Sequence, residues 1–149
     1  EDLIEINGGD WEGHYWRDLP GLFPEDTVLW NTRPYDFAPK NGEPMRHVYE
    51  RMKCAVLEIV EKNQGKQICI TSHGCAIRNF LCWAMGKPIE KINEVDWCDN
   101  TAVSIIDFDD AFEPTVVLAN DASHLSGACS GRFRVRCPLA AVGLQGEQK

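Results

Sequence analysis

The chain has 149 residues, of which 44% are hydrophobic and 26% are charged, which fits one globular domain with a sizeable core. Its net charge of −8 argues against general binding to nucleic acids or to anionic membranes. No run approaches the roughly 18 apolar residues that a membrane-spanning helix needs. These features exclude a nucleic-acid or membrane partner, and no pattern predicts an oligomeric state.

Seven cysteines form no C-x-x-C pair, and the His and Cys spacings match no zinc template. Cys69, Cys75 and Cys82 fall in apolar segments, where a free thiol behaves as a small hydrophobic group. We therefore expect reduced, buried cysteines, no metal site and a cytoplasmic location.

The first 42 residues are rich in Gly, Pro, Trp and Asp, which predicts an ordered but irregular surface segment. Apolar residues then recur every three or four positions from Met45 to Ile59, which predicts an amphipathic helix that starts near Pro44 and ends near Gly65. The short apolar run Ile68–Ile70 predicts a buried strand, and residues 76–85 predict a helix closed by Gly86.

Lys87-Pro88 interrupts that pattern, and a second short helix is expected at residues 89–94. Two β-branched runs, residues 102–108 and 115–118, predict further strands. This order of elements predicts an α/β fold built on a mixed sheet. Residues 126–149 carry four basic side chains against one carboxylate and show no helix or strand period, so we expect a domain at 1–125 followed by an atypical basic tail.

His73 falls between the predicted strand at Ile68–Ile70 and the following helix. In open α/β sheets, ligands bind at the carboxyl ends of strands, and the N–H groups at a helix start favour an anion such as phosphate. His73 and the backbone of Gly74 are therefore candidates for binding a phosphate group.

Five segments resemble, in the same order, motifs of the histidine phosphatase superfamily, the phosphoglycerate-mutase-like proteins. They run from the "L-x-E-x-x-x-G-x-W-x-G" pattern near the N-terminus to the last strands, and together span residues 1 to about 125. The segments are residues 3–13, Gly42-Glu43, residues 71–78, residues 99–104 and residues 120–125.

This resemblance implies a mostly parallel mixed sheet flanked by helices and a two-step phosphoryl transfer through a phosphohistidine. It assigns Glu5 as the general acid and His73 as the second histidine, which stabilises the transferred oxygens. The implied enzyme is a cytoplasmic phosphatase that acts on a small phosphorylated metabolite and needs no metal or other cofactor. Preorganised donors and a protonated carboxyl group suit this chemistry.

The nucleophile of the family belongs to an Arg-His-Gly motif, and no Arg-His-Gly occurs in this sequence. The one Arg-His pair, Arg46-His47, lies within the predicted amphipathic helix, and we expect it on the helix surface. We therefore expect the chain to correspond to the C-terminal part of a histidine phosphatase, as a fragment or a truncated gene product. Its sheet would be incomplete at the N-terminus, and the chain alone would be inactive.

Three side chains have other interpretations. His124 is expected to be structural, His14 to line a substrate entrance or lie on the surface, and Arg78 to pair with a carboxylate or reach a phosphate. Three alternatives to a phosphatase also stay open. They are a non-catalytic phosphate-binding or regulatory module, a phosphoglycerate-mutase-type phosphotransferase, and a poorly folding product with exposed strand edges.

Overall fold

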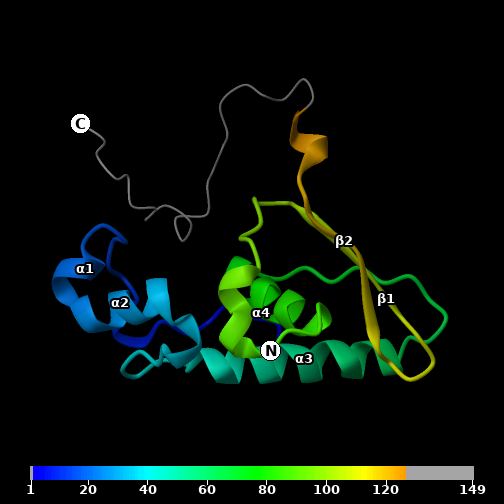
Figure 1. The fold of residues 1–149 in the computed structure, drawn as a ribbon, viewed down its shortest axis with the longest axis horizontal. Helices are drawn as coiled ribbons and strands as arrows, with labels where there is room; N and C mark the ends of the chain where they lie inside the picture. The colour runs from blue at the N-terminus through cyan, green and yellow to red at the C-terminus, as the bar shows by residue number, and fades with distance from the viewer. Residues whose placement is uncertain (1, 127–149) are drawn as a thin grey trace.

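The computed structural model describes residues 2–126. Helix α3 runs along one side of the molecule with α4 packed on it, the two short helices α1 and α2 lie at one end, and a β-hairpin lies at the other (Figure 1). The elements are α1 (Leu19–Leu22), α2 (Pro24–Thr32), α3 (Met45–Glu61), α4 (Gly74–Ala84), β1 (Val103–Phe108), β2 (Pro114–Asp121), and four 3-10 turns, η1 (Gly9–Trp11), η2 (Pro34–Asp36), η3 (Ile89–Glu94) and η4 (Ser123–Ser126). None of the described helices is long and apolar enough to span a membrane.

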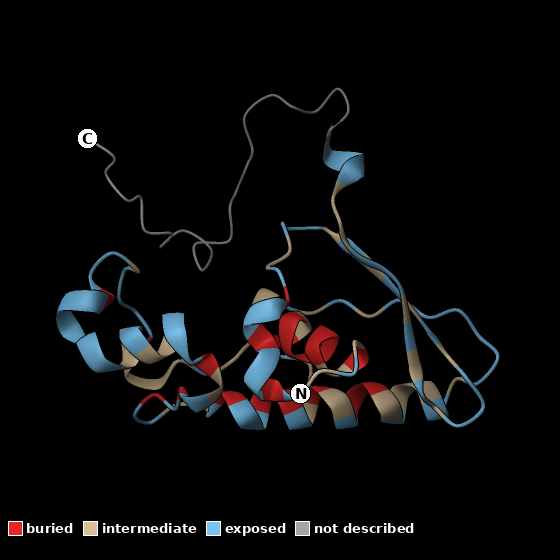
Figure 2. Ribbon diagram, in the orientation of Figure 1, coloured by how far each residue is buried: buried red, intermediate tan, exposed pale blue. Residues whose placement is uncertain are grey.

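The core lies between α3 and α4, and buried residues concentrate there (Figure 2). One face of α3 is buried along most of its length, as its apolar spacing predicted. Met52, Val48 and Leu81 are at most 1% exposed. Full burial of such a side chain contributes roughly 1.5–3 kcal/mol. Both predicted helices are therefore confirmed, and α3 extends to Glu61.

Helix α4 ends as the sequence predicted. Gly86 has a φ of +68° and donates its N–H to the carbonyl of Trp83, while the N–H of Lys87 bonds the carbonyl of Cys82. These two bonds satisfy carbonyl groups at the helix end, and they form because Gly86 adopts the left-handed conformation. Further along, the predicted helix at residues 89–94 forms as the 3-10 turn η3.

Strands β1 and β2 form an antiparallel hairpin in which Asp107 lies opposite Thr115. Both predicted strands are thus confirmed, but the mostly parallel sheet is not observed: residues 2–126 contain one two-stranded antiparallel sheet. The predicted strand Ile68–Ile70 was wrong, because the extended segment there pairs with no strand in the described part of the chain. A strand needs a hydrogen-bonded neighbour, which a local apolar run cannot supply.

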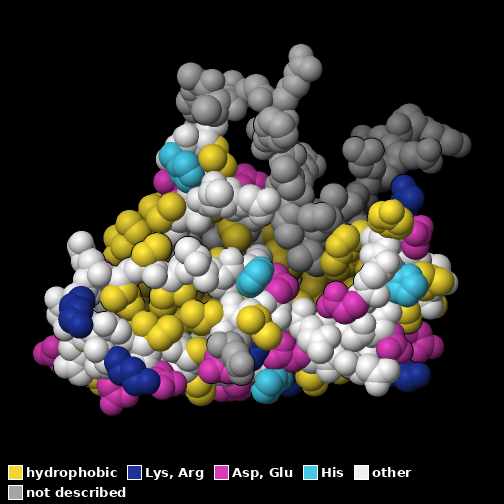
Figure 3. Space-filling view, turned by 180° about the vertical axis from the view of Figure 1, so that it is seen from behind, with side chains coloured by type: hydrophobic (Ala, Val, Ile, Leu, Met, Phe, Trp, Pro, Cys, Tyr) yellow, Lys and Arg dark blue, Asp and Glu magenta, His cyan; other side chains and the backbone are white. Residues whose placement is uncertain are grey.

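Several apolar side chains remain exposed on the hairpin and on the extended segment before α4. Hydrophobic side chains gather on the half of the molecule that carries the hairpin (Figure 3). They include Ile68, Val103, Ile105 and Val117, each more than two-fifths exposed. The expected burial of Cys69 was also wrong: its thiol is exposed, as is that of Cys54. Cys75 and Cys82 are buried as expected.

The N-terminal 42 residues contain more regular structure than the sequence indicated. Helices α1 and α2 and two 3-10 turns surround an aromatic cluster in which Trp11 contacts Trp16 and Trp30 at ring-centroid distances of 5.7 Å each. Phe37 lies 4.7 Å from Trp11 and completes this layer. The proposed tail at 126–149 falls outside the described residues, apart from Ser126.

Candidate active site

Two glycine-containing segments, residues 7–10 and residues 40–43, cross each other next to Glu5. The N–H of Asp10 bonds the carbonyl of Lys40 at 2.9 Å, and the N–H of Glu43 bonds the carbonyl of Asn7 at 2.8 Å. A Cβ on Gly9 would lie 2.2 Å from the carbonyl oxygen of Lys40, and Gly9 has a φ of +56°. Only glycine fits this crossing. The crossing therefore fixes the segment that carries Glu5 against the start of α3.

An ion pair between Arg51 of α3 and Glu43, just before that helix, holds the same segment. Arg51 binds Glu43 through two parallel bonds of 2.6 and 2.9 Å, and it also donates to the carbonyls of Asp2 at 2.7 Å and Glu5 at 3.3 Å. Only 11–12% of either charged side chain is exposed. Burial alone would raise the pKa of Glu43, but the hydrogen bonds and charge of Arg51 lower it.

Arg51 was not among the residues predicted for the site. Glu43 lies before α3 and is joined to it by Pro44 in an extended conformation, so helical spacing does not predict its contact with Arg51. What the sequence does not contain is the position of residues 2–5, whose carbonyls Arg51 also binds.

Glu5 lies at the start of α4. Its Oε2 accepts the N–H of Cys75 and its Oε1 accepts the N–H of Ala76, both at 3.1 Å, and Oε1 also accepts its neighbour Ile6 N–H at 2.9 Å. The first N–H groups of a helix have no partners within the helix, and a carboxylate there is favoured by the helix dipole. Glu5 therefore binds where the sequence predicted an anion.

His73 is the residue immediately before α4, in an extended backbone conformation, and its imidazole is exposed. Its side chain makes no hydrogen bond that caps α4. Cys75 and Ala76 follow it by two and three residues, so the structure brings Glu5 and the His73 segment together across about 70 positions of sequence. The N–H of Gly74 is not a donor to Glu5, and its predicted role as a phosphate donor remains a prediction.

Other candidate residues do not join this site. Arg78 is 8% exposed and donates to the carbonyls of Val95 and Ile92 at 2.8 and 2.9 Å, so it pairs with neither a carboxylate nor an open phosphate position. His47 is exposed on α3 and lies 2.6 Å from Glu43, as expected for a surface residue. His124 is exposed in η4.

The thiol of Cys75 does not offer a nucleophile. Burial raises the pKa of the Cys75 thiol, and the nearby Glu5 carboxylate raises it further. A thiol in that state is not the reactive thiolate. In residues 2–126, no three His, Cys, Asp or Glu side chains gather as they would around a metal ion.

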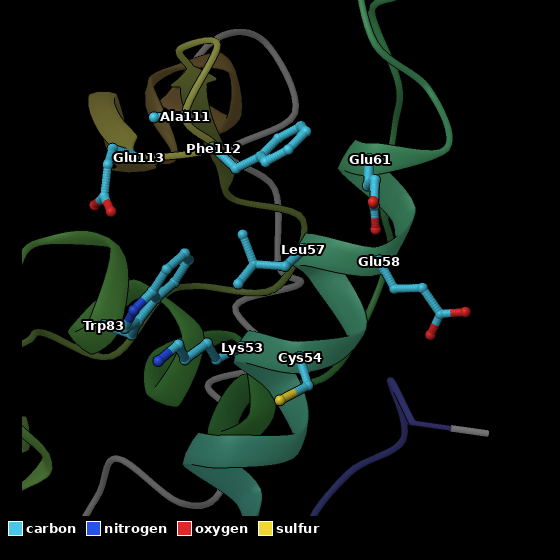
Figure 4. A pocket seen from close by; sticks show the side chains of 9 residues that line it. All are labelled: Lys53, Cys54, Leu57, Glu58, Glu61, Trp83, Ala111, Phe112 and Glu113. Atoms are coloured by element: carbon cyan, nitrogen blue, oxygen red, sulfur yellow. The ribbon is translucent and has the colours of Figure 1, made fainter.

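Two cavities among the described residues bear on the site. The larger, about 550 Å³, lies between α3, α4 and the turn of the hairpin, and Lys53, Trp83 and Phe112 are among the side chains around it (Figure 4). It contains neither Glu5 nor His73. The smaller, about 220 Å³, we call the tryptophan pocket. Its lining residues are Glu5, Ile6, Gly8, Trp11, Glu12, Gly13, His14, Trp16, Trp30 and Phe37.

His14 thus lines a cavity next to the candidate acid, and it is also exposed, so both interpretations of this residue stay open. Its ring also packs against Phe23, with 5.7 Å between ring centroids. The indole Nε1 of Trp11 is buried and has no hydrogen-bond acceptor among the described residues. Unsatisfied polar groups of this kind are few in folded proteins.

In this α/β fold, the Glu5 carboxylate and the segment that carries His73 thus meet at the start of one helix. The model of the histidine phosphatase superfamily (branch 1) matches residues 1–122, and the chain belongs to that family.

The chain is 27% identical to phosphoserine phosphatase 1 of Hydrogenobacter thermophilus over 83% of its own length and 57% of that protein's. It is 33% identical to the 2,3-bisphosphoglycerate-dependent phosphoglycerate mutase of Methanococcus vannielii over 53% and 36% of the two chains. Its structure resembles that of Bacillus stearothermophilus YhfR with a TM-score of 0.79, at 28% identity over 84% of this chain and 61% of the other. The chain therefore spans somewhat more than half the length of the phosphatase relative.

Proposed function

We propose that this chain supplies the acid and the second histidine of a phosphatase that acts on small phosphorylated metabolites through a phosphohistidine. The observation that carries the proposal is the contact of Glu5 with the N–H groups that follow His73. This contact joins the two sequence motifs to which the family resemblance assigns the acid and the second histidine. The phosphatase relative supports the class of reaction.

In the proposed reaction, a histidine from an Arg-His-Gly motif attacks phosphorus, and the bond from phosphorus to the leaving oxygen breaks. Glu5 gives its proton to that oxygen, and His73 donates a hydrogen bond to the phosphoryl oxygens as they gather charge. Water then attacks the phosphohistidine and transfers a proton to the Glu5 carboxylate, which restores both histidine and acid.

A protonated Glu5 remains compatible with the observed contacts. Its carbonyl oxygen still accepts the N–H of one α4 residue, while its hydroxyl oxygen turns its proton toward the leaving group. The second N–H of α4 then becomes free for a phosphoryl oxygen. In the proposed reaction, the N–H groups at the start of α4 are thus shared between Glu5 and the phosphoryl group.

The 149-residue sequence contains no Arg-His-Gly, and its one Arg-His pair lies on the surface of α3. For this stretch by itself we propose no turnover, which favours a phosphate-binding module as the second candidate. Isothermal titration with vanadate discriminates the two states: heat of binding without hydrolysis supports the module. Trapping of a phosphohistidine in this chain would show that another nucleophile operates.

The test of His73 uses the product of the complete gene and p-nitrophenyl phosphate in the presence of a metal chelator. We expect hydrolysis without metal, and we expect His73→Ala to lower kcat by about 10²–10³-fold, the usual effect of removing one transition-state donor. His124→Ala, on exposed η4, is the matched control and should retain full activity. Unchanged turnover in His73→Ala would remove His73 from the mechanism.

The test of Glu5 compares two leaving groups. Glu5→Gln retains one hydrogen-bond acceptor but cannot donate an acidic proton. We expect it to lower kcat for an alkyl phosphate by about 10²–10⁴-fold and to affect p-nitrophenyl phosphate far less, because nitrophenolate leaves without a proton. Equal losses for both substrates would show that Glu5 has only a structural role.

We also propose a cytoplasmic location and a domain that ends near residue 125. Cys54, Cys69, Cys75 and Cys82 are free thiols, two of them exposed, which supports a reducing compartment. The net charge of −8 supports a small-molecule partner over nucleic acid or an anionic membrane.

A further inference from the structure

We infer that the tryptophan pocket binds the leaving group of the phosphoester, and that this group is uncharged and apolar or aromatic. The inference rests on the proposed function, because it assigns the pocket to the alcohol that Glu5 protonates. The general acid must reach the leaving oxygen, so the rest of the leaving group lies beside it. The tryptophan pocket is the one of the two cavities that Glu5 lines.

The walls of this pocket are mainly aromatic. Trp30 lies 4.9 Å from Phe37 and 5.9 Å from Trp16 between ring centroids, and Trp16 meets Trp11 edge-on at 5.7 Å. These rings pack on one another, which limits their freedom before a ligand arrives. An apolar ligand therefore gains contact area here without the entropic cost of immobilising these aromatic side chains.

The charges of the pocket select against an anion. Glu5 and Glu12 both line it, and neither lysine nor arginine is among its ten lining residues. The Glu12 carboxylate is held in place, because its Oε1 accepts the N–H of Gly8 at 2.9 Å. Because Glu5 is protonated when it acts as the acid, a leaving group with its own carboxylate would meet the charge of Glu12 and no basic partner other than the His14 ring. This charge pattern disfavours phosphoglycerates as substrates.

The size of the pocket sets an upper limit on the leaving group. A dry cavity of about 150 Å³ is enough to bind benzene. The tryptophan pocket, at about 220 Å³, thus fits a single ring with a short substituent and is smaller than the roughly 300–1,000 Å³ of pockets for drug-sized ligands.

The experiment titrates the 149-residue chain with benzyl alcohol and, separately, with benzoate, which share a ring and differ in charge. The indole N–H signals of Trp11, Trp16 and Trp30 are followed by NMR at pH 8, where an ordinary imidazole is uncharged. We expect benzyl alcohol to shift these signals in a saturable manner with a millimolar dissociation constant. We expect benzoate to bind at least about tenfold more weakly.

Glu12→Gln tests the role of charge. It retains an acceptor for the Gly8 N–H, removes one of the two carboxylates, and should narrow the difference between benzoate and benzyl alcohol. Glu61→Gln, at the other cavity, removes the same charge and should leave the difference unchanged. Benzoate binding as tightly as benzyl alcohol, no saturable shift for either probe, or shifts confined to Trp83 would each overturn the inference.

The same titration on His73→Ala separates this inference from the proposed function. Benzyl alcohol should bind that variant unchanged, because His73 does not line the pocket. Loss of the His73 effect on hydrolysis with intact benzyl alcohol binding would refute the proposed mechanism and leave an aromatic ligand site. Normal catalysis that prefers anionic leaving groups would refute the pocket assignment alone.

Discussion

Two segments approach the start of α4, and they differ in how they are held. Residues 2–7 are bound from three directions, by Arg51, by the N–H of Glu43 and by the first N–H groups of α4. The backbone of residues 67–71 has no strand partner in the described part of the chain, and Ile68 is 43% exposed. Ser72, which follows the second segment, donates its hydroxyl to the carbonyl of Leu3 in the first at 2.6 Å.

This contrast shows that the segment of Glu5 is fixed by contacts within the described residues, whereas the segment that leads to His73 is fixed by fewer of them. The acid segment is positioned by side chains and turns within residues 2–51, together with a helix start that any α-helix would provide. The segment that leads to His73 has the sequence of a buried strand but lies open on one side. The placement of Glu5 therefore depends on the bonds that Arg51 and Glu43 make to residues 2–7. The placement of His73 depends on the start of α4.

The largest expected effect concerns Arg51→Met. Loss of the guanidinium leaves Glu43 nearly buried without its partner and removes the bonds to residues 2 and 5. We expect a loss of about 3–5 kcal/mol in the free energy of unfolding, measured by urea denaturation. Arg46→Met is the matched control on the same helix, because Arg46 pairs with Glu90 at 2.6 Å but is 50% exposed. It should cost at most about 1 kcal/mol.

Equal losses in the two arginine variants would mean that the acid segment is not held by Arg51. A second variant separates the charge from the packing. Replacement of both Glu43 and Arg51 by Met removes the unpaired charge as well, and it should recover part of the stability that Arg51→Met loses. No recovery would place the importance of Arg51 in its bonds to the carbonyls of Asp2 and Glu5.

A smaller effect is expected for Glu5→Ala. The variant leaves the N–H groups of Cys75 and Ala76 without their acceptor, which should cost about 1–2 kcal/mol, as for loss of a helix cap. Hydrogen exchange of these two amides should accelerate, while exchange at Leu81 in the same helix stays slow. Glu12→Ala is the control, since Glu12 accepts a single N–H from Gly8 outside α4. Unchanged exchange at Cys75 and Ala76 would contradict the observed contact.

The dependence of stability on pH should report the same ion pair. The pKa of Glu43 is lowered in the folded state, so its contribution is fully present above the ordinary pKa of a glutamate and is lost as the pH falls through the lowered value. We expect stability to decline below about pH 4.5, and Glu43→Gln to flatten that decline. Thermal unfolding of both proteins between pH 6 and pH 3 measures this decline in stability. An unchanged slope in Glu43→Gln would assign acid lability to other carboxylates.

The sequence predicted best what depends on near neighbours. Helices α3 and α4 follow from apolar spacing, and the glycine that closes α4 is recognisable because the bonds it permits lie within five residues. The prediction of a strand at Ile68–Ile70 failed for the opposite reason, since its partner cannot be read from the run itself. Helix α2 and the aromatic cluster were also missed, because packing across Trp11, Trp30 and Phe37 leaves no period in the sequence.

The site was predicted in part. Glu5 and His73 were chosen from motifs, and the structure places Glu5 at the helix that begins after His73. The direct bond from the Glu5 carboxylate to α4 could not be predicted, because the residues are about 70 positions apart and no local pattern records the contact. The acceptors of Arg78 could not be predicted either, because they are two backbone carbonyls, in η3 and just after it.

The smallest expected effect concerns the segment of residues 67–71, which leads to His73. Ile68→Thr replaces an exposed side chain, so it should change the free energy of unfolding by no more than about 0.5 kcal/mol and reduce self-association, since exposed apolar surface promotes it. Ile92→Thr is the matched substitution in the core, at 1% exposure, and should cost about 2–3 kcal/mol. Urea denaturation and light scattering measure both properties. A cost above about 1 kcal/mol for Ile68→Thr would show that this side chain is covered in solution, and the two segments beside α4 would then be equally well held.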